Sequence, residues 1–274
     1  MLLPLPDMFA RYIGMCEAVI TIGIVLRFRG NVLVPEQVND GCAAGFGARL
    51  IGGADDAVLP IGMHDYIDAL GRCMLVDKTM FIADVLDCDA SVMVCCRPEG
   101  FGKSMNLSML KAFLERPVVG RVGRISFAGA QIWDADGGRY RNEYACYPVI
   151  SLDFSGAARR GAAVVGVVRD ALSGECARLM PLLEAPDLAR DKVRHIERVA
   201  RGVASDAEVA SVLGMLIELL EMACDEQVVL LVDGYDAAWS RRASARGASG
   251  ADPVELFDCV LFDAIAAAGN SLRL

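Results

Sequence analysis

The residues best suited to chemistry are Gly102, Lys103 and Ser104, which stand between a short apolar run and a segment with helical periodicity. The pattern Gly-x-x-x-x-Gly-Lys-Ser/Thr is typical of loops that hold nucleotide phosphates with backbone N–H groups. Arg97 stands five residues before Gly102, where that pattern has glycine, so the match is partial. The sequence therefore predicts a phosphate-binding loop, with an ordinary strand-to-helix turn as the alternative.

Each residue type has a role in phosphate binding that follows from its charge and reach. Lys103 would bring an ammonium to the β- and γ-phosphates, and Gly102 would let the backbone approach because it has no Cβ. The Ser104 hydroxyl would take one coordination place on Mg²⁺. Asp233 ends an apolar run over residues 228–232 and would hold the same ion directly or through water. Lys103 and Asp233 are the predicted catalytic residues, and Ser104 and Asp233 the predicted Mg²⁺ ligands.

The elements on either side of the loop come in the order that a phosphate site needs. Residues 92–96 form a continuous apolar run that Pro98 and Gly100 then break, which predicts a buried strand of a parallel sheet. From Lys103 the apolar residues recur at intervals of three and four, which predicts a helix over residues 103–115. Unpaired N–H groups and the helix dipole would attract an anion to the start of this helix.

The rest of the chain predicts an α/β fold with a parallel sheet flanked by helices. We expect strands at residues 147–154 and 227–233, and helices at residues 159–184, 187–201, 206–224 and 253–268. Asp77 stands where the N-cap of a further helix should lie. In an open parallel sheet ligands collect at the carboxyl ends of the strands, where Asp233 is expected. Residues 270–274 look like the opening of another strand, so we expect the fold to be incomplete at its C-terminal end.

Composition narrows the function classes. Hydrophobic residues make up 54% and charged residues 23%, which is typical of a globular protein. Lys and Arg number 27 against 36 Asp and Glu, a net charge of −9, so nucleic acid is not indicated as a partner. Residues 1–55 are the least interpretable part, an extension that is either a strand or poorly ordered. Its nine-residue apolar run over residues 18–26 is short of the roughly 20 residues that span a bilayer, so no membrane association is predicted, with a membrane anchor as the alternative.

The cysteines and histidines do not predict a site. Ten cysteines are scattered with no Cys-x-x-Cys pair and no histidine at ligand spacing, so we interpret them as reduced thiols of a cytoplasmic protein. His64 and His195 are far apart in the sequence and no motif places a nucleophile beside either one.

Several segments together resemble the AAA-ATPase-like family of predicted bacterial and eukaryotic-microbe proteins. The resemblance covers roughly residues 61–274 and rests on Val76-Asp-Lys-Thr-Met-Phe-Ile82, Arg97-Pro98, Phe101-Gly-Lys-Ser-Met-Asn-Leu-Ser-Met-Leu110, Tyr147-Pro-Val-Ile150 and Val232-Asp-Gly-Tyr-Asp236. It implies a P-loop ATPase fold over residues 56–274 with Mg-ATP as ligand, and often a nuclease-like domain downstream. In that family the loop begins with Arg-Pro, so Arg97 becomes an expected feature. The resemblance implies nucleotide contacts from Arg97, Pro98, Gly100, Phe101, Gly102, Lys103, Ser104 and Met105.

Two departures from the family bear on activity. The family usually has two arginines after Arg-Pro, whereas this chain has Glu99 and Gly100. The family's second motif is Asp-Glu-Tyr-Asp, and its glutamate position is Gly234 here, which cannot act as a general base. Asp236 is the candidate substitute. We therefore predict ATP binding with slow or lost hydrolysis, and expect Gly234→Glu to raise ATP turnover provided that the remaining site is intact.

Two other functions stay open from the sequence. One is a non-catalytic interaction or regulatory module that keeps the fold for structural reasons. The other is a phosphotransferase acting on a small molecule, which would need an acceptor site and a base that no motif supplies. The sequence also leaves oligomerisation open.

Overall fold

The computed structural model describes residues 20–27, 50–51, 59–88, 92–98, 100–118, 127–158, 164–185, 187–235, 237 and 260. Predictions that concern Glu99, Asp236, the helix at residues 253–268 and the strand opening at residues 270–274 lie outside this part of the chain, apart from the single residue 260.

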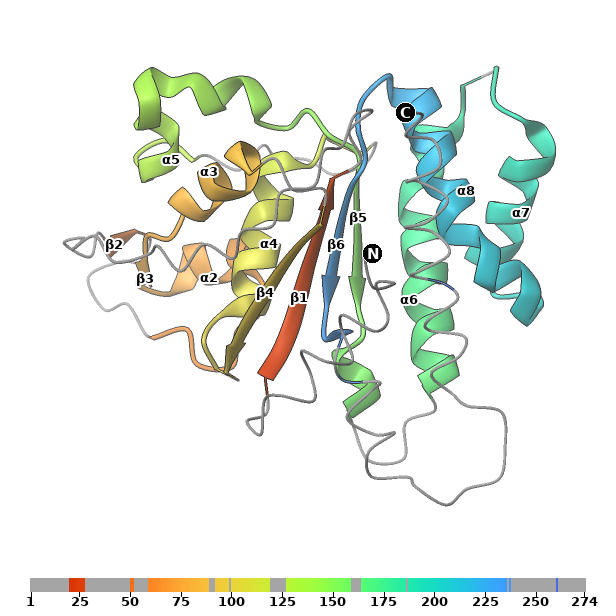
Figure 1. The fold of residues 1–274 in the computed structure, drawn as a ribbon, viewed down its shortest axis with the longest axis horizontal. Helices are drawn as coiled ribbons and strands as arrows, with labels where there is room; N and C mark the ends of the chain where they lie inside the picture. Colours follow the sequence, from red (N-terminus) through yellow and green to blue (C-terminus); the bar gives the residue numbers. More distant parts are fainter. Residues whose placement is uncertain are drawn as a thin grey trace, which may run out of the picture.

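A four-stranded sheet separates two layers of helices (Figure 1). The strands are ordered β4-β1-β6-β5, where β1 is Ile20–Arg27, β4 is Val92–Pro98, β5 is Val149–Asp153 and β6 is Val229–Asp233. One layer contains α2 (Tyr66–Arg72), α3 (Met80–Asp87), α4 (Lys103–Leu114) and α5 (Gln131–Asp134). The other contains α6 (Val164–Leu179), α7 (Arg190–Ala200) and α8 (Asp206–Cys224). The predicted α/β class is confirmed.

Shorter elements accompany the main sheet and its helices. A two-stranded sheet pairs β2 (Leu50–Ile51) with β3 (Leu75–Val76) beside α2 and α3. Three segments of 3₁₀ type follow α5, β5 and α6, namely η1 (Ala135–Glu143), η2 (Ser155–Ala158) and η3 (Met180–Leu183).

The direction of β1 corrects the prediction of a parallel sheet. β5 and β6 are parallel neighbours, but β1 is antiparallel to β4 on one side and to β6 on the other. β4 and β6 therefore run in the same direction with an oppositely directed strand between them. The sequence pattern indicates that a strand is buried but not which neighbour it pairs with or in which sense. Residues 20–27, interpreted from the sequence as a strand or a poorly ordered extension, are a strand in the middle of this sheet.

Both faces of the sheet are buried, which explains the apolar run before Asp233. Leu230 and Val232 on β6 join the core beneath α6 and α8, whereas Val229 and Leu231 join the core beneath α4. All four side chains are at most 2% exposed. A strand covered on both sides needs apolar residues at successive positions, so its side-chain alternation is invisible in the sequence.

The predicted helices that lie among the described residues are found with small shifts, but Asp77 does not cap α3. The residue before α3 is Thr79, whose side chain makes no capping hydrogen bond. Asp77 is buried, and its carboxylate accepts from the Thr79 N–H at 2.9 Å and from the Gln131 N–H at 2.8 Å. Asp77 therefore joins the start of α3 to the start of α5, a contact over 54 residues that local spacing could not reveal.

A buried charged cluster fixes the sheet at the end opposite the glycine loop. Arg178 of α6 pairs with Glu175 and with Glu115, the residue after α4. Its guanidinium also donates to the Val149 carbonyl at 2.5 Å, and the Glu175 carboxylate accepts from the Ser151 N–H at 2.9 Å. Each ion is thus paired and hydrogen-bonded, as a charge withdrawn from water requires.

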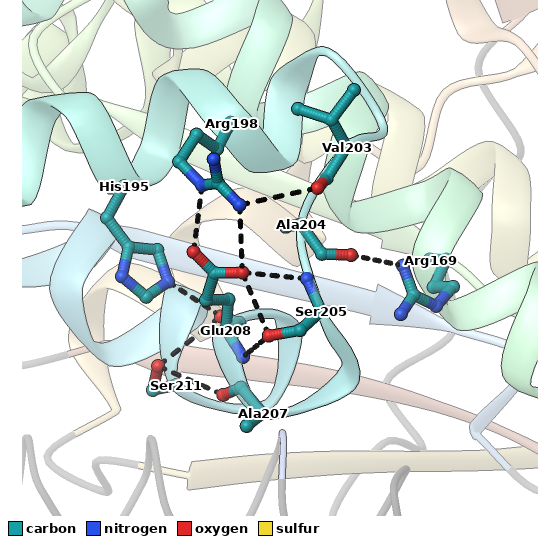
Figure 2. Close-up of polar contacts among 9 residues, drawn as sticks. All are labelled: Arg169, His195, Arg198, Val203, Ala204, Ser205, Ala207, Glu208 and Ser211. Atoms are coloured by element: carbon teal, nitrogen blue, oxygen red, sulfur yellow. Dashed lines mark hydrogen bonds and ion pairs between the residues drawn. The ribbon is translucent and has the colours of Figure 1, made fainter.

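The junction of α7 and α8 is held by a capping box (Figure 2). The Ser205 hydroxyl accepts from the Glu208 N–H at 3.4 Å, and the Glu208 carboxylate accepts from the Ser205 N–H at 2.7 Å. A hydrogen bond from Arg198 and two from Ser205 lower the pKa of Glu208 to about 2. His195 lies 2.8 Å from the Glu208 carbonyl oxygen, so this histidine joins two helices.

Among the helices of the described residues, none is long and apolar enough to span a bilayer.

We expect Ser205→Ala to lower the free energy of unfolding by about 1 kcal/mol, because the Glu208 N–H at the start of α8 loses its acceptor. Urea unfolding would measure the change. Ser211→Ala is the matched control, since this hydroxyl also lies on α8 but only donates to the carbonyls of Ala207 and Glu208 within the helix. The control should change stability by less than about 0.5 kcal/mol. Equal losses in the two variants would contradict a specific role for the capping box.

Candidate functional site

The glycine loop connects the carboxyl end of β4 to the start of α4, as predicted. β4 ends at Pro98 and α4 begins at Lys103. Gly100 and Gly102 have φ values of +82° and +75°, in the left-handed region that residues with a Cβ rarely adopt. Gly102 is the N-cap of α4, so the chain reverses at this glycine and then enters the helix.

The first turn of α4 presents the predicted phosphate-binding residues. Lys103 and Ser104 are half-buried, and the helix has no acidic residue in its first turn. The first N–H groups of a helix have no partner within the helix and attract anions. The other face of α4 fixes its position, because Leu107, Leu110 and Phe113 are at most 8% exposed in the core.

The remaining residues of the predicted loop differ in their surroundings. Phe101 is 61% exposed beside the loop, whereas Met105 packs partly against the core under α4. Arg97 and Pro98 are the last residues of β4, with backbones paired to Thr21 and Ile20 of β1. The structure thus brings Gly100 to Met105 together at the start of α4.

Asp233 at the end of β6 contacts this loop, which joins the two predicted Mg²⁺ ligands. Its carboxylate accepts a side-chain hydrogen bond from Ser104, and Lys103 lies near enough to act on it through its charge. The Gly234 N–H also donates to the Asp233 carboxylate at 3.0 Å. Burial, and secondarily the Asp153 carboxylate, raises the pKa of Asp233 above its ordinary value of 3.8, while Ser104, Gly234 and Lys103 oppose that rise. Asp233 is therefore an acid held partly out of water next to a serine hydroxyl.

Asp153 is a second acid at the site and was not singled out from the sequence. It is the last residue of β5 and stands directly beside Asp233 in the parallel register. Its carboxylate accepts from the Ser155 N–H at 2.8 Å, and the residue is exposed. The sequence did contain a signal for Asp153, namely an acid at the end of a predicted strand, which is the signal that identified Asp233. What was missing was the pairing of the two strands.

The residues at the loop fit a magnesium ion shared with phosphates. Ser104 and Asp233 supply a hydroxyl and a carboxylate, the hard oxygen ligands that Mg²⁺ takes, and a cation would offset the charge of a half-buried acid beside Asp153. No group of three or more His, Cys, Asp or Glu side chains in the described part of the chain could hold a metal by itself. Magnesium is commonly bound by one or two protein groups together with phosphate oxygens, which matches this donor set.

Gly234 packs against the backbone that follows the neighbouring strand β5. Its φ is +66°, and a Cβ built there would lie 2.5 Å from the Ser155 nitrogen and 2.8 Å from the Ser155 Cα. Any side chain would require the backbone after β5 or after β6 to shift. The expectation that Gly234→Glu raises turnover overlooked this packing, because the sequence shows the missing carboxylate but not the space it would need.

We expect Gly234→Ala to lower the free energy of unfolding by about 2–4 kcal/mol, since it combines a left-handed backbone with overpacking against Ser155. Gly174→Ala is the matched control, because Gly174 lies on the exposed face of α6 with no atom within 4 Å of its Cβ position. The control should raise stability by about 0.5–1 kcal/mol. Equilibrium denaturation of both variants checks this, and a neutral Gly234→Ala would refute the packing constraint.

Comparison with known proteins gives one result. No curated protein and no solved structure matches the chain. The protein family described as "Predicted AAA-ATPase" matches residues 60–249, which include the glycine loop, α4, Asp153 and Asp233. This match covers more than half of the 274 residues. The resemblance noted in the sequence is thereby confirmed, and the chain belongs to the AAA-ATPase-like family.

Proposed function

We propose that this protein binds Mg-ATP at the start of α4 in the manner of a P-loop protein, and that it hydrolyses ATP slowly or not at all. The observation that supports the proposal most directly is the hydrogen bond between Ser104 and Asp233, the two predicted Mg²⁺ ligands. These residues are 129 positions apart in the sequence (233 − 104 = 129). Family membership supports the same ligand.

The residues divide the binding task by chemistry. The N–H groups at the start of α4 would hold phosphate oxygens, and the Lys103 ammonium would neutralise part of their charge. Ser104 and Asp233 would hold the magnesium ion, whose role when bound is to neutralise and orient the terminal phosphates. The hydrogen bond that Asp233 already accepts keeps the two ligands close before the ion arrives.

Slow or lost hydrolysis follows from the absence of a base at Gly234. An attacking water needs a carboxylate or an equivalent group to orient it, and glycine offers none. Asp236 remains the sequence-based candidate for this role.

The alternative functions predict different behaviour. A regulatory module that keeps the fold for structural reasons would bind no nucleotide. A phosphotransferase would transfer phosphate only to an added acceptor, and no acceptor site is identified among the described residues.

We also propose that the family domain spans residues 56–274 and that β1 completes its sheet. We further propose that the protein works in the cytoplasm, since the seven described cysteines carry no disulfide.

Millimolar Mg-ATP should raise the thermal midpoint of the wild-type protein. A ligand at 100 times its Kd adds about 2.7 kcal/mol to the folded state, and differential scanning fluorimetry would detect this. Lys103→Ala should lose most of the shift because the phosphates lose their ammonium. Lys111→Ala is the control, because Lys111 lies in the last turn of the same helix and should keep the shift. No shift in the wild type would refute nucleotide binding.

Asp233→Asn should stabilise the nucleotide-free protein at pH 7 and at the same time abolish the magnesium-dependent part of the ATP shift. The wild-type carboxylate pays a desolvation penalty when ionised, whereas the amide is neutral and keeps an acceptor for Ser104.

The pH dependence of that difference has a defined sign. Because the folded-state pKa of Asp233 is raised, the wild type binds the proton more tightly when folded, and its stability falls as the pH rises from 3.8 through the raised pKa. The advantage of Asp233→Asn should therefore grow with pH across this window and then level off. Chemical unfolding at a series of pH values would test it, and an advantage that shrinks as the pH rises would show that Asp233 is not a buried acid.

A further inference from the structure

A lysine from another part of the chain lies over the glycine loop. The Lys78 Nζ is 3.9 Å from the position that a Cβ on Gly102 would occupy, and it is among the heavy atoms nearest to that glycine. Lys78 is exposed and belongs to the turn that precedes α3. The Lys78 ammonium therefore stands beside the backbone that leads into α4. Lys78 and Gly102 are 24 residues apart in the sequence (102 − 78 = 24).

The two neighbours of Lys78 hold it in this place. Asp77 and Thr79 are both buried, at 9% and 0% exposure. The Asp77 carboxylate accepts from the Thr79 hydroxyl at 2.6 Å, and the Thr79 hydroxyl accepts from the Ile132 N–H at 3.1 Å. With the residues on both sides anchored to α5, the backbone at Lys78 has little freedom, and its side chain extends from a fixed point toward the loop.

We propose that Lys78 is a second phosphate-binding cation, which acts with Lys103 on the β- and γ-phosphates of the nucleotide. This inference rests on the nucleotide binding proposed above. A phosphate on the N–H groups at the start of α4 would lie beside Gly102, and the Lys78 ammonium stands next to that glycine. Asp77 and Thr79 are then positioning residues that hold the lysine, and they do not contact the ligand.

The charge balance at the site favours a second cation. A nucleoside triphosphate brings several negative charges to a loop whose own lysine is Lys103 and which already faces Asp233 and Asp153. Magnesium and Lys103 neutralise part of this charge. The mobile ammonium of Lys78 has the reach and the three donors needed to follow the phosphates.

The test compares Lys78→Met, which keeps the alkyl stem and removes the charge, with wild type and with Lys78→Arg. Kd values for Mg-ATP and for magnesium tripolyphosphate would be measured by isothermal titration calorimetry. We expect Lys78→Met to raise the Kd of both ligands roughly tenfold, because the variant loses one charge-assisted hydrogen bond to the phosphates. Lys78→Arg should restore most of the affinity, and the thermal midpoint of the nucleotide-free protein should not change. Lys192→Met is the matched control, because it removes a lysine from α7 in the other helical layer.

The outcomes separate this inference from the proposal beneath it. If wild type binds neither ligand, nucleotide binding itself fails and the role of Lys78 falls with it. If wild type binds Mg-ATP and Lys78→Met binds it equally well, only the role of Lys78 is refuted. A variant that loses affinity for Mg-ATP but not for tripolyphosphate would place Lys78 at the base or ribose and would also overturn the inference.

Discussion

The withdrawal of the Asp233 carboxylate from water is the constraint on which the site depends. The acid lies at the carboxyl end of a strand buried on both faces, beside a second acid on the adjacent strand. Ser104 and the Gly234 N–H supply hydrogen bonds that offset part of the cost of that position. This position destabilises the ionised carboxylate of Asp233 when no cation is bound. A magnesium ion beside the carboxylate would offset that destabilisation.

The two helical layers give this end of the sheet its shape. α4 lies on one face and carries the glycine loop at its start, while α6 and α8 cover the other face and hold β5 and β6 in parallel register. Gly234 leaves that register as a turn that passes within contact distance of Ser155. Because the two strand ends approach closely, Asp153 stands next to Asp233 in the sheet, and a side chain at Gly234 would collide with the Ser155 backbone.

Much of the site could be predicted because its signals are local. The order of strand, glycine loop and helix is a change of periodicity within one short segment, and the apolar run before Asp233 marks a strand covered on both faces. Asp77 was misassigned as a helix cap because one of its partners, the Gln131 N–H, is far away in the sequence. Asp153 and Lys78 were not singled out from the sequence for the same reason, since Asp153 stands beside Asp233 and Lys78 stands beside Gly102 through contacts with distant segments.

The sequence by itself determined the α/β class and the family, and it predicts which residues would bind phosphate and magnesium, because these inferences depend on residue type and on spacing within short segments. Only the tertiary structure decided that β1 lies antiparallel between β4 and β6 and that Asp153 stands beside Asp233. It also decided that a side chain at Gly234 would require the backbone to shift, and that the Lys78 ammonium lies over Gly102. Such neighbours are set by strand pairing and by helix packing across tens of residues, and local periodicity does not encode them.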